Sequence, residues 1–269
     1  MTAPEPWNTL RRHTAARIAL GRAGVSQPTR PWLQFALAHA QARDAVHLPF
    51  DSATLAAALA QHGFTTLTLE STAADRATYL RRPDLGRRLS PRSAAMLQAS
   101  GASGASGASG ASGASGADLA VVLGDGLSAC AVHSHALPLL LDLRVRLEAA
   151  GLVLGPLALV HQCRVALGDE VGALMGARAV LVLIGERPGL SSPDSLGAYL
   201  TWAPQPGCSD AQRNCVSNIR PEGLAAASAA RKIAWLLAAA RRLGASGVQL
   251  KDESDVPALG DEGPPPQLA

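Results

Sequence analysis

A charged loop directly follows the most apolar stretch of this chain. Six consecutive apolar residues, 179–184, lead into Gly185-Glu186-Arg187-Pro188-Gly189. An unbroken apolar run is typical of a strand buried on both faces, and ligands of open α/β sheets bind beyond the carboxyl ends of such strands. Glu186 could accept hydrogen bonds from the amide or hydroxyl groups of a ligand. It could equally form an ion pair with Arg187 or Arg164 that closes the loop, and the residues alone leave both open.

A glycine-rich turn suggests a second chemistry, the binding of a dinucleotide. Residues 124–129 read Gly-Asp-Gly-Leu-Ser-Ala, which matches the G-x-G-x-x-A pattern that brings backbone amides close to a pyrophosphate. The acidic residue expected on a ribose would have to come from the end of the next strand. That end reads His161-Gln162-Cys163-Arg164 and has no carboxylate. A tight strand-to-helix turn that lines some other ligand is therefore favoured over an NAD site.

The spacing of the histidines and cysteines in the sequence does not match that of a metal site or of a catalytic nucleophile. His133 and His135 are two residues apart on an expected helix, so they lie on different faces and a shared metal ion is not favoured. The four cysteines have no C-x-x-C spacing, and no metal site is expected. Cys215 stands in a polar stretch, 213–220, that we interpret as a tight loop, and a packing role is favoured for it over a nucleophilic one.

Four arginines surround one expected turn. They are Arg81, Arg82, Arg87 and Arg88, on either side of Pro83-Asp84-Leu85-Gly86. Their guanidinium groups could hold a phosphate or a carboxylate, or pair across a subunit interface. A solvated, partly ion-paired loop is at least as good an interpretation.

The elements that must position these residues fall on two sides of a low-complexity stretch. Residues 99–117 repeat Ala-Ser-Gly six times and end in Ala117, a composition that favours a flexible tether. Residues 1–98 are expected to be mainly helical, with helices at 31–46 and 51–61 and a short strand at 65–69. Residues 118–253 are expected to alternate, with strands at 118–123, 156–162 and 179–184, helices at 127–150 and 168–176, an extended segment at 198–202 and a helix at 222–243.

This order predicts an α/β fold, Rossmann-like, with a mostly parallel sheet flanked by helices and preceded by a smaller, mainly helical N-terminal region. Residues 254–269 are rich in Pro, Gly and Asp and are expected to form a disordered tail. The formal charge of +3 does not argue for nucleic acid. No apolar run approaches the ~20 residues of a membrane span and no signal peptide is evident, so a cytoplasmic location is expected.

Several uncommon stretches of sequence point to one known family. They are residues 10–24, 39–46 and 79–88 in the first half, and 125–128, 185–196 and 215–219 in the second. Together they resemble the small (light) subunit of adenosylcobalamin-dependent ethanolamine ammonia-lyase, over about residues 7–251 apart from the tether. The chain departs from the family in two ways: the tether replaces an expected short connection, and the long N-terminal extension of some relatives is missing.

The resemblance implies a non-autonomous subunit of a carbon–nitrogen lyase that converts ethanolamine to acetaldehyde and ammonia by radical chemistry. In that family the large subunit binds the substrate, and the light chain contacts the lower face and nucleotide tail of the cobalamin. By position, the cofactor-binding residues are expected to be Val165, Glu186 and Cys215, and no catalytic residue is expected in this chain. The segment around His133 lacks the D-x-H-x-x-G motif, so the cobalamin should keep its own dimethylbenzimidazole as lower ligand.

The resemblance also implies a large-subunit partner and a hetero-oligomer with several copies of each subunit. It leaves open whether this chain directs the enzyme to a bacterial microcompartment. Two functions of other classes remain as alternatives. The glycine turn would suit a stand-alone nucleotide-binding oxidoreductase, and the arginine-rich loops would suit a non-catalytic assembly protein.

Overall fold

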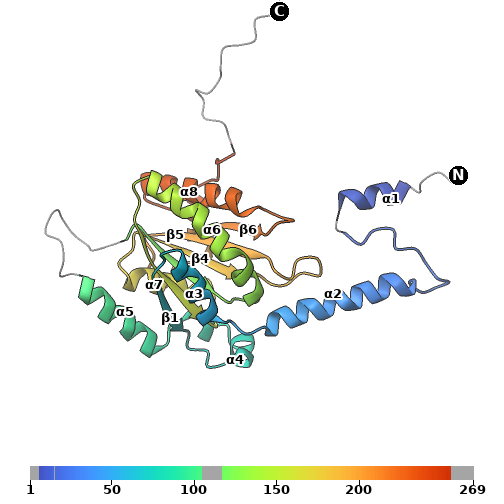
Figure 1. Ribbon diagram of the computed structural model, residues 1–269, viewed down its shortest axis with the longest axis horizontal. Helices are drawn as coiled ribbons and strands as arrows, with labels where there is room; N and C mark the ends of the chain where they lie inside the picture. The colour runs from blue at the N-terminus through green and yellow to red at the C-terminus, as the bar shows by residue number, and fades with distance from the viewer. Residues whose placement is uncertain (1–5, 15, 105–116, 256–269) are drawn as a thin grey trace, which may run out of the picture.

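A six-stranded sheet forms the centre of the molecule, with the order β1-β3-β2-β4-β5-β6. The computed structural model describes residues 6–14, 16–104 and 117–255 (Figure 1). The strands β1, β3, β2 and β4 are parallel, and β5 is antiparallel to both of its neighbours. The expected α/β class with a mostly parallel sheet is therefore confirmed. The strands are β1 (Thr66–Glu70), β2 (Leu119–Gly124), β3 (Leu154–His161), β4 (Ala179–Gly185), β5 (Leu196–Trp202) and β6 (Arg213–Ile219).

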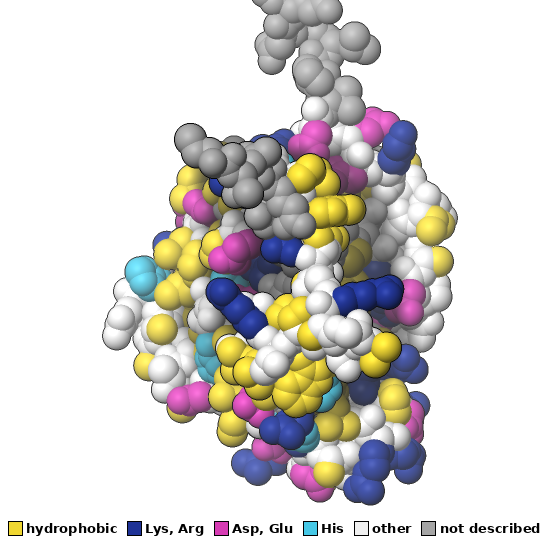
Figure 2. All heavy atoms as spheres, turned by 90° about the vertical axis from the view of Figure 1, so that its right-hand side faces the viewer, with side chains coloured by type: hydrophobic (Ala, Val, Ile, Leu, Met, Phe, Trp, Pro, Cys, Tyr) yellow, Lys and Arg dark blue, Asp and Glu magenta, His cyan; other side chains and the backbone are white. Residues whose placement is uncertain are grey.

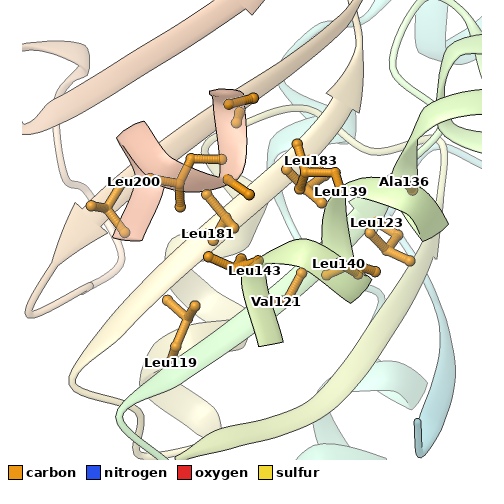
Figure 3. Packing of buried hydrophobic residues seen from close by; sticks show 14 of the residues in the cluster. Leu119, Val121, Leu123, Ala136, Leu139, Leu140, Leu143, Leu181, Leu183 and Leu200 are labelled. Atoms are coloured by element: carbon orange, nitrogen blue, oxygen red, sulfur yellow. The ribbon is translucent and has the colours of Figure 1, made fainter. Parts of the chain in front are cut away.

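Helices cover both faces of this sheet. On one face lie α3 (Ser52–Gln61), α6 (Ala129–Ala149) and α8 (Ala226–Leu243), which pack on alternate residues of the strands. Figure 3 shows this layer, with leucines of α6 against Leu123 and Leu181. On the other face α7 (Leu167–Leu174) and α5 (Pro91–Gly104) cover the intervening residues, such as Val122 and Val182. Successive side chains of a strand point to opposite faces of the sheet, so neighbouring residues of each strand belong to different layers.

The chain reverses its direction of travel across the sheet at β2. It passes from β2 through α6 to β3 on one side, and then through α7 on the opposite face to β4 on the other side of β2. Ligands of open α/β sheets bind in the crevice that such a reversal leaves at the carboxyl ends of the strands. Those ends are Gly124, His161 and Gly185.

Capping residues recognised in the sequence lie at the ends of α3 and α8 in the structure. The Asp51 carboxylate accepts a hydrogen bond of 3.0 Å from the amide of Thr54 and caps α3, which is followed by Gly63 at φ 78°. Gly244 ends α8 at φ 72°, as expected of a C-cap glycine. The start of α8 was predicted wrongly, because Pro221 and Glu222 form a turn and the helix begins at Ala226.

Two further expectations need correction. The polar stretch 213–220 is not a tight loop, since residues 213–219 form β6 and pair with β5. The helix α5 continues to Gly104 and so includes the first two Ala-Ser-Gly repeats, where a tether was expected. The other repeats, at 105–116, and residues 256–269 of the expected tail lie outside the described residues. Within the described part of that tail, Asp255 forms an ion pair with Arg231 at 2.7 Å.

The N-terminal region contributes to the sheet and also extends away from it. It supplies β1, which pairs with β3, together with α3 and α4 (Arg76–Arg81). By contrast, α1 (Pro6–Leu10) and α2 (Thr29–His47) project to the right of the sheet in Figure 1. Only Ala38 and Ala45 of α2 are buried, and its larger apolar side chains are exposed. Figure 2 views the molecule from this side and shows hydrophobic side chains next to side chains of Lys or Arg.

Among the helices of the described ranges, none is both long and apolar enough to cross a lipid bilayer.

A half-buried histidine on α6 should make the stability of the fold depend on pH. The Nε2 atom of His133 accepts a hydrogen bond of 3.2 Å from the Asp51 amide, which requires a neutral ring. Burial lowers the pKa of His133, and the Asp51 carboxylate only partly opposes this. The unfolded chain therefore binds a proton at a higher pH than the folded chain does, and stability is lost as the pH falls through the ordinary range of histidine.

We expect the free energy of unfolding of the wild-type chain to fall between about pH 8 and about pH 5.5, and His133→Gln to flatten this dependence. Denaturant titrations at a series of pH values would measure it. An unchanged pH profile in the variant would contradict the assignment.

Candidate functional site

A pocket of about 540 Å³ lies at the crevice where the strand order reverses. Its wall includes residues that follow β2, β3 and β4, and others from β5 and β6. Val165, Glu186 and Cys215 all line it. These residues were expected from separate stretches of sequence to contact one cofactor, and the fold brings them into one cavity.

Among the described residues, no Lys, Arg or His forms an ion pair with the Glu186 carboxylate, which is held by neutral donors. Its Oε2 atom accepts a hydrogen bond of 2.5 Å from the Ser195 hydroxyl and one of 3.3 Å from the Asn218 amide. Its Oε1 atom lies against Gly197, where an added Cβ would be only 2.8 Å away. The described residues give Oε1 no hydrogen bond and give Glu186 no ion pair with Arg187 or Arg164. One carboxylate oxygen therefore remains able to accept a hydrogen bond from a ligand.

Val165 lies in the turn between β3 and α7, and this turn is fastened by Asp125. The two Asp125 carboxylate oxygens accept hydrogen bonds from the backbone amides of Gln162, at 3.1 Å, and Cys163, at 2.9 Å. They hold Gln162 in the left-handed region, at φ 55°. The Arg76 guanidinium of α4 reaches the same carboxylate at 3.3 Å. Burial raises the pKa of Asp125, while the Cys163 amide and Arg76 favour the charged form.

Sequence reasoning missed this role, because Asp125 was considered only as the variable position of the glycine motif. The one available signal was a charged residue between two glycines directly after an entirely apolar strand. Such a carboxylate is expected to be buried, and a buried carboxylate needs donors.

Cys215 and Tyr199 are cross-strand partners on β6 and β5, and both line the pocket. Burial raises the pKa of the Cys215 thiol, and the Glu186 carboxylate adds to the rise. Burial also raises the pKa of Tyr199. Both groups are therefore neutral near pH 7, and a thiol of raised pKa is a weak nucleophile. Cys215 itself is exposed on the pocket wall, so its neutral side chain is available to contact a ligand and does not pack within the core.

The glycines of the 124–129 turn serve close packing. A Cβ on Gly126 would lie 2.2 Å from the Gly185 carbonyl oxygen, and one on Gly185 would lie 2.0 Å from the Ser128 carbonyl oxygen. The Leu127 amide donates to the Gly185 carbonyl at 2.9 Å. The turn is thus pressed against the end of β4, and the geometry explains the motif without a pyrophosphate.

A buried ion pair lies beside the pocket and was not foreseen. The Arg213 guanidinium contacts the Asp169 carboxylate at 2.5 Å, and it also donates to the Thr201 hydroxyl and the Cys208 carbonyl. Burial raises the pKa of Asp169, and the Arg213 guanidinium opposes the rise. Nothing in the sequence relates positions 169 and 213, because only the pairing of β6 with β5 brings them together.

The arginine cluster of residues 81–88 separates into different environments. Arg82 donates twice to the Asp84 carboxylate, at 2.9 and 2.7 Å, and Arg81 donates to the Ala77 carbonyl. Arg87 lines the pocket, whereas Arg88 lines an adjoining cavity of about 760 Å³ that also includes Arg87. Only one arginine of the four therefore faces the candidate site.

The two histidines of the H-x-H pair also have different partners. His133 bonds to the amide of Asp51, as described above, while His135 contacts the Asp194 carboxylate at 3.2 Å. Asp194 also lies 3.5 Å from the Arg220 guanidinium. These contacts fasten the loop between β4 and β5, which begins with Glu186.

Comparisons with known proteins agree on one family. The family model described as "Ethanolamine ammonia-lyase light chain (EutC)" matches residues 4–251. The chain is 57% identical over 254 residues to an ethanolamine ammonia-lyase small subunit of Ralstonia nicotianae, covering 94% of this chain and 91% of the relative. It is 56% identical over 261 residues to one of Azotobacter vinelandii, covering 97% and 93% of the two chains. It is 54% identical over 263 residues to one of Pseudomonas aeruginosa, covering 98% and 93%.

Proposed function

Because the chain belongs to the ethanolamine ammonia-lyase light-chain family, we propose that it is the cobalamin-binding subunit of an adenosylcobalamin-dependent ethanolamine ammonia-lyase. The observation that carries this proposal is the meeting of Val165, Glu186 and Cys215 in one pocket. That pocket lies where open α/β sheets bind their ligands. We further propose that the sheet and its helices form a Rossmann-like cobalamin-binding domain.

The residues of the pocket fit a corrinoid. A corrin ring carries amide side chains, and the free Oε1 atom of Glu186 can accept from an amide N–H. Val165, Cys215 and Tyr199 supply a neutral wall for the rest of the ring. The residues that line the pocket include no histidine, so we propose that the cofactor retains its dimethylbenzimidazole as lower ligand.

The size of the pocket supports a shared site. A volume of about 540 Å³ is typical of pockets that bind drug-sized molecules. A whole cobalamin is larger than such molecules, so the pocket can hold only part of it. This chain would therefore cover one side of the cofactor, with the large subunit covering the other.

The division of labour follows from that arrangement. Bound adenosylcobalamin supplies the 5′-deoxyadenosyl radical that starts the conversion of ethanolamine to acetaldehyde and ammonia. The residues of this chain bind and orient the cofactor and exclude water from its lower side. We propose that the large subunit binds the substrate and that this chain contributes no catalytic residue.

We propose that the N-terminal region, residues 1–98, contacts the large subunit in a hetero-oligomer with several copies of each chain. Support comes from α2, on which Trp32, Phe35 and Leu37 are 56%, 45% and 61% exposed. Large apolar side chains gathered on one projecting helix are typical of an interaction surface. We propose a cytoplasmic location for the assembly, with a bacterial microcompartment within the cytoplasm as the alternative.

Co-expression tests the function directly. The complex of this chain with its large subunit should release acetaldehyde from ethanolamine only when adenosylcobalamin is added, and this chain alone should release none. Saturable binding of NAD to the isolated chain would instead favour a nucleotide-dependent oxidoreductase.

Replacing Glu186 tests the site. Glu186→Ala removes a charged hydrogen-bond acceptor. A hydrogen bond to a charged group contributes about 1.5–3 kcal/mol to the free energy of binding. The dissociation constant of the complex for adenosylcobalamin should therefore rise by roughly 10- to 100-fold. Glu148→Ala is a matched control, because Glu148 is an exposed carboxylate outside the pocket. Unchanged affinity in a folded Glu186→Ala complex would remove this residue from the site.

A further inference from the structure

The pocket wall carries three arginines that lack a carboxylate partner. Arg87, Arg164 and Arg187 all line the pocket, and none of them forms an ion pair within residues 6–14, 16–104 and 117–255. A fourth pocket arginine, Arg213, is neutralised by Asp169 and Asp210. The pocket therefore has a surplus of positive charge beside Glu186.

Arg164 is the most firmly placed of the three. Its Nη2 atom donates to the Tyr79 carbonyl at 3.1 Å, and its guanidinium carbon lies 4.5 Å from the centre of the Tyr79 ring. Its Nε atom is buried and has no hydrogen-bond partner in the described part of the chain. The described residues provide only Nη2 with an acceptor, and Arg164 lines the pocket, so the Nη1 atom remains available to an acceptor from a ligand.

Backbone amides add to the same corner of the pocket. Val165 and Ala166 precede α7 directly and line the pocket. The amides of Leu167 and Gly168 donate back to the carbonyls of Arg164 and Val165. The amides of Val165 and Ala166 have no acceptor among the described residues. Free amides at the start of a helix attract anions, and these two belong to residues that line the same pocket as Arg164.

We propose that Arg87, Arg164 and Arg187, together with the amides of Val165 and Ala166, form a subsite for a phosphodiester. This inference rests on the proposed function and assigns one part of it, the recognition of the nucleotide tail. The phosphodiester of that tail is the anionic group of a cobalamin, whereas the side chains of its ring are neutral amides. Guanidinium groups and free amides are the donors that bind phosphate best, and Glu186 is left to the amides of the ring.

Binding of two corrinoids to the complex of both subunits tests the assignment. Cyanocobalamin contains the phosphodiester, and cyanocobinamide contains the same ring without the phosphate and nucleotide. The variants are Arg87→Gln, Arg164→Gln and Arg187→Gln, with Arg88→Gln as a matched control because Arg88 lines only the adjoining cavity. Absorbance titrations give the dissociation constant of each probe.

Each pocket variant should weaken cyanocobalamin binding about 10-fold and leave cyanocobinamide binding unchanged, and Arg88→Gln should change neither. Raising the salt concentration should weaken cyanocobalamin binding more than cyanocobinamide binding. Equal losses for both probes would overturn the subsite, because the arginines would then act on the ring or on the fold. Unchanged cyanocobalamin affinity in all three variants would overturn it as well. A wild-type complex that binds neither corrinoid would overturn the proposed function itself.

Discussion

Replacement of Arg213 with methionine should lower the free energy of unfolding by about 3–5 kcal/mol. The Arg213 and Asp169 side chains are only 3% and 1% exposed. The guanidinium also donates to the buried Thr201 hydroxyl and to the partly buried Cys208 carbonyl, so its removal leaves these two acceptors without this donor as well. The Asp169 Oδ2 atom already lacks a partner within the described residues. The variant would therefore retain a buried carboxylate with no compensating charge.

The pH dependence of this loss identifies its cause. Burial raises the pKa of Asp169 even with Arg213 present, and removing the guanidinium raises it further. An acid whose folded pKa exceeds its unfolded pKa destabilises the fold increasingly as the pH rises above the unfolded value. The loss in Arg213→Met should thus be smallest near about pH 3, below the ordinary pKa of Asp, where the carboxyl is mostly protonated in both states, and should grow toward neutral pH.

Denaturant unfolding of two further variants provides the control. Asp169→Leu combined with Arg213→Met should recover much of the lost stability, because apolar residues of similar volume can replace a buried ion pair. Arg178→Met breaks the more exposed pair with Asp118, at 3.2 Å, and should cost no more than about 1 kcal/mol. A double variant as unstable as the single one would show that the loss arises from packing rather than from the uncompensated charge.

The parts of this fold that are fixed by local pattern could be predicted from the sequence. The apolar run at 179–184 predicted β4, and its position at a strand end placed Glu186 at a pocket. Asp51 and Gly244 act as the caps that their residue types indicate. Each of these features depends on neighbours within a few residues.

Features that depend on distant partners could not be predicted in the same way. The strand β6 contains Asn and Ser residues that favour turns, and its pairing with β5 overrides that preference. The contact of Arg213 with Asp169 then follows from the pairing. The glycine turn at 124–129 was ambiguous because close packing and phosphate binding both require glycine, and only the distance from Gly126 to Gly185 separates them. Glu186 was ambiguous for a related reason, since its donor Ser195 lies on the far side of the loop.

Asp125 bonds residues that are distant in the sequence to the turn that lines the pocket. Its replacement has the second largest expected effect. Asp125→Ala removes the acceptor of the Gln162 and Cys163 amides and the carboxylate partner of Arg76. The Arg76 Nη2 atom is already buried without a partner in the described residues. We expect the free energy of unfolding to fall by about 3–5 kcal/mol, because a largely buried guanidinium loses its counter-charge and two backbone donors lose their acceptor.

The same variant should also lose cobalamin affinity under conditions where it remains folded. The bonds from Asp125 hold the turn that leads to Arg164 and Val165, and Arg76 connects that turn to α4 of the N-terminal region. A loosened turn would separate the Val165 side of the pocket from Glu186, which directly follows β4 and whose own bonds to Ser195 and Asn218 are untouched. Asp125→Asn keeps one carbonyl acceptor and should give intermediate losses in both stability and affinity. Titration of the folded complexes with cyanocobalamin measures this, and a destabilised Asp125→Ala complex with wild-type affinity would mean that the turn does not position the pocket.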